Sequence, residues 1–129
     1  MVEGIILAAG SSSRAGCFKM ELPLGDRTLI ERSIEGMYKV CSLIVVVGGF
    51  RIERVTEILR GYSKVHVVEN ANWRLGMFSS VKVGVRELKV ERFFLLPADV
   101  PLVPEGVYRQ LLSVDCEIVI PTWDEKKGH

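Results

Sequence analysis

The sequence predicts an α/β fold with three layers, in which a mostly parallel, Rossmann-like sheet carries helices on both faces. Short, continuous apolar runs rich in β-branched residues recur along the chain, and runs of this kind are typical of strands covered on both faces. Segments with helical periodicity separate these runs. Strands that alternate with helices favour an open parallel sheet whose ligands bind at the carboxyl ends of the strands.

The apolar runs set the expected strands in order along the chain. Each run is short, and each ends at Gly, Asn or Pro, residues that interrupt strands. The five expected strands are residues 4–7, 43–47, 65–68, 93–96 and 118–120.

Helical patterns fill the intervals between the expected strands. Thr28 and Glu31 have capping-box spacing ahead of an apolar stripe, and a second stripe over residues 52–59 is closed by Gly61. Pro104, in a first-turn position, opens a further helix. Residues 81–86 alternate with period two and also fit a helical face, so the pattern leaves strand and helix open there. We predict a helix, partly because Ser79 or Ser80 can cap it.

Size and composition indicate one soluble globular domain over residues 1–129. The chain has 129 residues, nearly half of them apolar, and a formal net charge of +1, which argues against disorder and against nucleic acid as a partner. Its three cysteines form neither a disulfide framework nor a zinc pattern, which fits a reducing cytoplasm. No apolar stretch approaches the length of a membrane span, and no secretory signal is expected.

The first expected strand runs into a loop suited to binding phosphate. Gly10 and Gly16 permit backbone angles that a Cβ would block, three serines add hydroxyl donors, and Arg14 and Lys19 bring positive charge. The spacing matches neither the P-loop nor the dinucleotide-binding fingerprint. The pattern therefore predicts a nucleotide substrate without the usual NTPase or dehydrogenase assignment.

A carboxylate follows the fourth expected strand. Asp99 lies just past residues 93–96, where a single carboxylate can hold a hard divalent ion that completes its shell with water and substrate phosphates. The alternative is that Asp99 only initiates a turn or caps the next helix. The phosphate-type loop elsewhere in the chain favours the metal role.

These stretches together resemble the MobA-like NTP transferase family. The loop is similar to that family's L-A-[AG]-G-x-x-x-R-x-G-x-x-K signature, residues 70–80 resemble its N-x-x-W-x-x-G-M-x-S-S stretch, and residues 99–101 resemble its D-x-P motif. Ala15 departs from the signature, where the family usually carries Met. The residues that match the first signature are Leu7, Ala8, Ala9, Gly10, Arg14, Gly16 and Lys19.

The resemblance implies transfer of a nucleoside monophosphate from an NTP to a phosphate-bearing acceptor such as molybdopterin, with release of pyrophosphate. It implies Arg14, Lys19 and Asp99 as catalytic residues, Mg²⁺ bound at Asp99, and a helix at residues 81–86. Ala9 resembles the CTP-using members; GTP with molybdopterin is the nearest alternative, and sugar-phosphate and methylerythritol-phosphate nucleotidyltransferases share the loop style. The nucleotide-binding residues implied are Leu7, Ala8, Ala9, Gly10, Arg14, Lys19, Asn70 and Ser80.

Members of the family usually continue for several dozen residues beyond the last residue of this sequence. A second metal-binding aspartate and much of the acceptor site lie there in the family, and the spacing of Asp124 does not suggest a substitute. A second hypothesis is therefore a nucleotide-binding module, or half an enzyme, without activity alone. Uncovered apolar surface is then expected, with self-association or a partner chain covering it.

Overall fold

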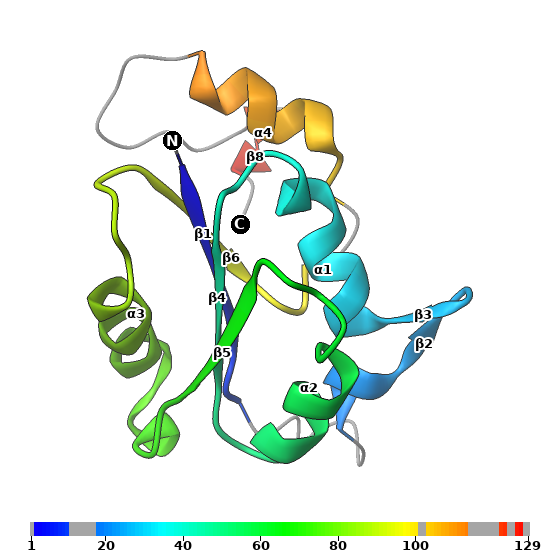
Figure 1. Cartoon of the computed structure of the whole chain (residues 1–129), viewed down its shortest axis with the longest axis vertical. Helices are drawn as coiled ribbons and strands as arrows, with labels where there is room; N and C mark the ends of the chain where they lie inside the picture. Colours follow the sequence, from blue (N-terminus) through cyan, green and yellow to red (C-terminus); the bar gives the residue numbers. More distant parts are fainter. Residues whose placement is uncertain (1, 11–17, 101–102, 114–121, 124–125, 128–129) are drawn as a thin grey trace.

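A parallel four-stranded sheet forms the centre of the computed structural model, which describes residues 2–10, 18–100, 103–113, 122–123 and 126–127 (Figure 1). The strands lie in the order β5-β4-β1-β6 and every neighbouring pair is parallel. The α/β class is confirmed, as are four of the five expected strands; residues 118–120 lie outside the described residues. The strands are β1 Glu3–Ala8, β4 Ile44–Gly48, β5 Val65–Glu69 and β6 Phe93–Pro97.

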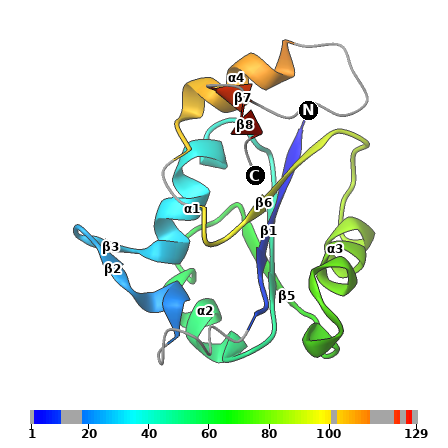
Figure 2. The same cartoon turned by 180° about the vertical axis from the view of Figure 1, so that it is seen from behind.

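Helices cover both faces of this sheet. Two of them, α1 and α2, lie on one face, and α3 lies on the other (Figures 1 and 2). The fourth, α4, packs beside α1 near the end of the sheet where β1 begins. The α-helices are α1 Leu29–Tyr38, α2 Ile52–Ile58, α3 Met77–Arg86 and α4 Glu105–Leu112, with short 3₁₀ turns η2 Lys19–Glu21 and η3 Trp73–Leu75.

The beginning of α1 is the capping box that the spacing predicts. The Glu31 backbone N–H donates to Thr28 Oγ1 at 3.4 Å, and the Thr28 N–H donates to Glu31 Oε1 at 3.0 Å. From there the helix places Ile30, Ile34 and Met37 in the core with no exposed surface. Burying each such side chain contributes about 1.5–3 kcal/mol relative to leaving it exposed, so α1 is held mainly by its apolar face.

Residues 81–86 are helical, as predicted, but the expected cap is wrong. The cap is Gly76, whose φ of 109° favours glycine, and no side chain caps α3. Ser79 and Ser80 instead lie within the first turn, where both accept from Asn70. A Cβ on Gly84 would lie 2.9 Å from Ile5 Cγ2, so a glycine at this position lets α3 pack closely against β1.

Other local differences are small. Pro104 is the cap of α4, so the helix begins one residue later than predicted. Two short antiparallel hairpins were not predicted: β2 Pro23–Leu24 with β3 Arg27–Thr28, and β7 Thr122–Trp123 with β8 Lys126–Lys127. In the described part of the chain, no helix has both the length and the apolar character needed to cross a membrane.

One face of β6 is incompletely covered. Leu95 pairs with Ile5 in the parallel register, so both lie on the face covered by α3. Ile5 is fully buried, whereas Phe93 is 38% and Leu95 42% exposed. Within the described residues β6 has a strand neighbour on only one side. An apolar strip is therefore open at this edge of the sheet.

Candidate active site

The strand order reverses between β1 and β6, and the region outside the carboxyl ends of these two strands is called the crevice below. The chain proceeds from β1 to β4 on one side and later returns to place β6 on the other side. Ligands in open α/β sheets bind at such reversals, outside the carboxyl ends of the strands. Leu7 pairs with Pro97, so Ala9 and Asp99 each lie two residues beyond this pair. The phosphate-type loop and the candidate metal ligand thus leave neighbouring strand ends.

The backbone at Asp99 is fixed from two sides. The Ala98 N–H donates to the Leu7 carbonyl at 2.9 Å, and the buried Ser33 hydroxyl of α1 lies 2.6 Å from the Ala98 carbonyl oxygen. Ser33 Oγ is also 3.0 Å from the Leu29 carbonyl, but a hydroxyl has one proton, so the shorter contact is the principal bond. The Asp99 side chain is exposed and forms no hydrogen bond or ion pair with the described residues. Among the described residues, nothing occupies its carboxylate.

We expect Ser33→Ala to weaken magnesium-dependent nucleotide binding several-fold, because the buried Ala98 carbonyl loses its partner and the turn carrying Asp99 loosens. The same loss should lower the free energy of unfolding by about 1–2 kcal/mol. The measurements are calorimetric titration with the magnesium nucleotide and denaturant unfolding.

Thr56→Ala is the matched control. Thr56 Oγ1 also donates to a carbonyl four residues earlier, at 3.0 Å, but on the exposed side of α2. It should leave nucleotide affinity unchanged. If Ser33→Ala lowers stability while affinity stays at the parent value, Ser33 supports the fold and does not position Asp99.

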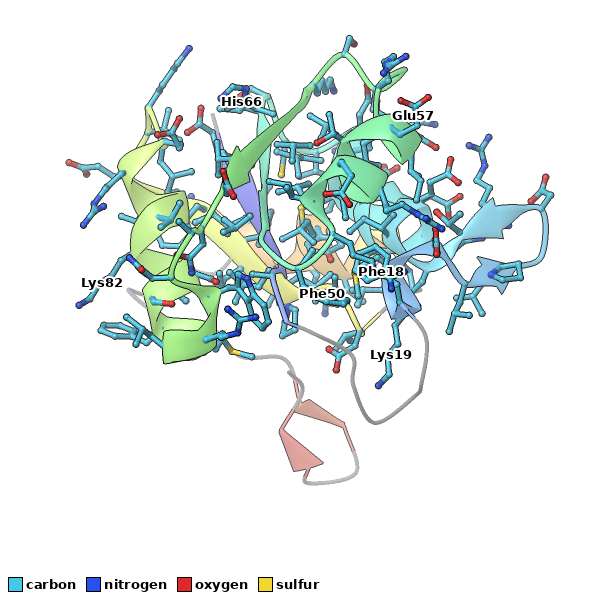
Figure 3. All side chains as sticks on the ribbon, turned by 90° about the horizontal axis from the view of Figure 1, so that it is seen from below. Phe18, Lys19, Phe50, Glu57, His66 and Lys82 are labelled. Carbon is cyan, nitrogen blue, oxygen red and sulfur yellow. The ribbon has the colours of Figure 1, made fainter. Side chains whose placement is uncertain are left out.

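The described part of the phosphate-type loop places Lys19 beside this crevice. Phe18 and Met20 are buried anchors on either side of Lys19, which is itself only partly buried. Figure 3, which looks onto the carboxyl ends of the strands, shows Lys19 projecting away from the body of the protein. Arg14 lies outside the described residues, so its role in binding triphosphate stays a prediction.

The conformational reason predicted for Gly10 is wrong. Its φ does not lie in the left-handed region, and a Cβ would meet no atom within 4 Å. Within the described protein an alanine would therefore fit at this position.

An open cleft of about 480 Å³ adjoins the crevice on the α3 side of the sheet. Its floor comes from the end of β1 and its wall from η3 and the first turn of α3. Four of the predicted nucleotide-binding residues line it, and Ala8, the last residue of β1, directly precedes the lining residue Ala9. The lining residues are Leu7, Ala9, Gly10, Trp73, Arg74, Gly76, Met77 and Ser80.

Asn70 organises the wall of this cleft. Its Nδ2 donates to Ser79 Oγ and to Ser80 Oγ, each at 2.9 Å, and its Oδ1 accepts from the Asn72 N–H at 3.0 Å. Both amide hydrogens are therefore used inside the protein, and Asn70 is buried. Ser80 accepts from Asn70, which leaves the Ser80 proton without an acceptor among the described residues. In this structure Asn70 orients Ser80, while nucleotide binding by Asn70 itself stays a prediction.

A row of aromatic rings that the sequence reading missed supports the cleft. Ring centroids are 5.9 Å apart from Phe18 to Phe50 and 5.8 Å apart from Phe50 to Trp73, both edge to face. A Cβ on Gly49 would lie 2.6 Å from Trp73 Cδ1, so only glycine leaves room for this ring. The Arg74 guanidinium carbon lies 4.6 Å from the centre of the Trp73 ring. The row connects the segment that carries Lys19 to the wall of the cleft.

The chemistry of the site is that of oxygen ligands and charge. Among the residues described, no three His, Cys, Asp or Glu side chains cluster to hold a metal ion. A single carboxylate beside a phosphate site nevertheless suits Mg²⁺, which keeps waters and binds substrate phosphates.

Cys41 is buried, and burial raises the pKa of its thiol to about 12, an effect that Lys64 only partly opposes. Cys41 is therefore no nucleophile at neutral pH.

The fold is that of a Rossmann-like α/β protein, a class in which ligands bind at the carboxyl ends of the strands. The family model of the MobA-like NTP transferase domain matches residues 4–129, and the chain belongs to this family. The family predicted from the three sequence stretches is confirmed.

Two curated relatives extend the comparison. The molybdenum cofactor cytidylyltransferase of Escherichia coli (strain K12) is 31% identical over 129 residues, covering 99% of this chain and 67% of the relative. The probable molybdenum cofactor guanylyltransferase of Bacillus cytotoxicus is 29% identical over 132 residues, covering 98% and 64%. The chain thus spans about two thirds of the length of these relatives. Relatives of both base specificities match at similar identity.

Solved structures share the fold. A nucleotidyl transferase from Methanothermobacter thermautotroptrophicus superposes with a TM-score of 0.79 at 27% identity, covering 88% of this chain and 57% of that one. A Mycobacterium tuberculosis H37Rv protein solved in complex with manganese gives a TM-score of 0.67 at 21% identity, covering 87% and 58%.

Proposed function

We propose that the chain transfers a nucleoside monophosphate from an NTP, with CTP favoured, to a phosphate-bearing acceptor such as molybdopterin. The observation that carries this proposal is the juxtaposition at one sheet edge. The end of the phosphate-type loop at Lys19, the available carboxylate of Asp99 and the cleft beside Ala9 all lie at the carboxyl ends of the strands. A triphosphate in the crevice can extend its nucleoside into the cleft.

The proposed reaction needs no covalent intermediate. An oxygen of the acceptor phosphate attacks the α-phosphorus of the NTP, the bond from that phosphorus to the bridging oxygen of the β-phosphate breaks, and pyrophosphate leaves with the bond electrons. The protein must align these groups and neutralise the developing charge. We assign that neutralisation to Lys19 and Arg14, and we assign the backbone around Gly10 to cradling the phosphates.

Asp99 would hold the metal ion in this scheme. Its exposed carboxylate, free of partners among the described residues, fits one hard ligand of Mg²⁺. When bound, the ion supplies charge neutralisation at the phosphates. The turn fixed by Ser33 and Leu7 gives Asp99 a defined position from which to bind it.

The cleft supports the choice of CTP. Ala9 is 6% exposed and lines the cleft, so its methyl group narrows the space that a glycine would leave. A smaller pyrimidine fits a narrowed site better than a purine. GTP with molybdopterin is the alternative. The chain is about equally identical to a cytidylyltransferase and to a guanylyltransferase, so the experiment below includes both nucleotides.

The open strip on β6 favours a second candidate. Phe93 and Leu95 are partly exposed on a strand with one described neighbour, which is typical of a surface that another protein segment covers. In this alternative residues 1–129 are one nucleotide-binding domain that needs additional protein for activity. Sedimentation analysis with and without nucleotide checks for association, and a monomer that turns over substrate contradicts this alternative.

Calorimetric titration with CTP and GTP, each with and without Mg²⁺, tests the proposed function. We expect magnesium-dependent binding, tighter for CTP, that weakens in an Asp99→Ala variant of unchanged fold. Binding of neither nucleotide overturns the proposal. Tighter binding of GTP than of CTP would leave the proposed nucleotidyl transfer in place but make GTP the preferred nucleotide.

A further inference from the structure

We infer that Arg74 reads the base of the nucleotide, by donating two hydrogen bonds to adjacent acceptor atoms on the edge of the ring. This inference rests on the proposed function, since it assumes that the cleft holds a nucleoside. The adjacent acceptors are O2 and N3 in cytosine, or O6 and N7 in guanine.

Arg74 is the one charged side chain among the described residues that line the cleft. The rest of the lining is apolar, apart from the Ser80 hydroxyl and the indole of Trp73. An apolar floor suits the face of a planar ring, and a few convergent polar groups fix its orientation. The side chains of Arg74 and Ser80 offer donors, so the cleft favours a ring edge that presents acceptors.

The guanidinium of Arg74 is held against an aromatic ring, and its N–H groups form no hydrogen bond with the described residues. It lies over the Trp73 ring, and Trp73 is seated against Gly49 and Phe50, so the platform is built into the fold. An arginine that stacks on an aromatic face keeps the N–H groups around its edge available for a planar, bidentate partner. The Arg74 side chain is therefore partly ordered before a ligand binds, which lowers the entropy cost of binding.

The absence of a carboxylate partner distinguishes Arg74 from many arginines of this chain. Within the described residues Arg74 takes part in no ion pair. Arginines that do pair with Asp or Glu there are Arg27, Arg32, Arg54, Arg60 and Arg109. The N–H groups of Arg74 are thus open to a ligand in the cleft.

The location of Arg74 favours the base over the phosphates. Asp99 follows β6, on one side of β1, whereas Arg74 belongs to η3, which follows β5 on the opposite side of the sheet order. A nucleotide whose phosphates occupy the crevice and whose nucleoside enters the cleft brings its base to Arg74. Phosphate binding by Arg74 is the alternative that the experiment must exclude.

The test compares Arg74→Met with Arg74→Lys by calorimetric titration of CTP, GTP and inorganic tripolyphosphate in the presence of Mg²⁺. Met covers Trp73 without donating, and Lys keeps the charge without the planar fork. We expect both variants to bind the preferred nucleotide about tenfold more weakly, the loss expected for one bidentate base contact, with tripolyphosphate affinity unchanged. Arg51→Met is the matched control, because Arg51 lies 5.2 Å from the centre of the Phe50 ring in the same row but does not line the cleft.

Three results overturn the inference alone: unchanged nucleotide affinity in Arg74→Met, an equal loss of tripolyphosphate affinity, or full recovery by Lys. Unchanged affinity in Arg74→Met would mean that Arg74 does not contact the nucleotide. Either of the other two results would mean that Arg74 binds the phosphates through its charge. Failure of the unmodified chain to bind either nucleotide overturns the proposed function, and this inference with it. Circular dichroism and thermal unfolding of each variant establish that the comparison is made between folded proteins.

Discussion

An Asp99→Asn variant is expected to lose at least about 100-fold in kcat/KM for nucleotidyl transfer, a loss of the size seen when one essential electrostatic contact to a transition state is removed. Asn keeps the shape of the side chain but removes the negative charge that would bind the divalent ion. Because Asp99 is exposed and has no partner among the described residues, stability should stay within about 0.5 kcal/mol of the parent. The measurement is pyrophosphate release from the magnesium nucleotide with the acceptor, alongside thermal unfolding.

Asp26→Asn controls for the loss of one surface carboxylate. Asp26 lies between β2 and β3, its Oδ1 is 2.7 Å from Arg32 Nη2 of α1, and its side chain is 88% exposed. Removing such an exposed ion pair costs at most about 1 kcal/mol and should leave kcat/KM unchanged. If Asp99→Asn turns over at the parent rate under saturating Mg²⁺, Asp99 is a turn residue and the metal lies elsewhere.

Gly36→Ala is expected to produce the largest loss of stability in the described fold, about 3 kcal/mol or more, as severe overpacking does. A Cβ on Gly36 would lie 1.9 Å from the Val103 carbonyl oxygen and 2.8 Å from Tyr108 Cε2. Backbone cannot yield as a flexible side chain does, so α4 must move away from α1. For a domain of this size the melting temperature should fall by roughly 10 °C.

Gly106→Ala provides the matched control in α4. A Cβ there meets no atom within 4 Å, and replacing glycine in a helix stabilises it by up to about 1 kcal/mol. The control should therefore melt at or slightly above the parent temperature. A Gly36→Ala protein that melts like the parent would show that the α1–α4 contact is looser in solution than in this structure.

Local patterns predicted much of this protein because their causes are local. The capping box of Thr28 and Glu31 joins residues three apart, so its spacing is enough to predict where α1 begins. Continuous apolar runs identified β1 and β4 because a strand buried on both faces needs apolar residues at every position. The loop after β1 and the position of Asp99 past β6 followed from the same runs.

The valine alternation in residues 81–86 illustrates where local information ends. Val81 and Val83 suit a strand by alternation, yet both pack against the sheet from α3, where Gly84 allows close approach to β1. The cap at Gly76 likewise depends on a side chain from outside the helix, since Asn70 donates to the serines predicted to cap it. Contacts between distant segments decided these features.

The sequence by itself determined the α/β class, the family, and most strands and helices. Only the tertiary structure decided that β1 lies between β4 and β6, which creates the crevice, and that Ser33 fixes the turn at Asp99. It also decided that Trp73 fits against Gly49 and carries Arg74 at the cleft. The physical reason is that periodicity and caps depend on neighbours within a few residues, whereas strand order and side-chain partners depend on which distant segments pack together.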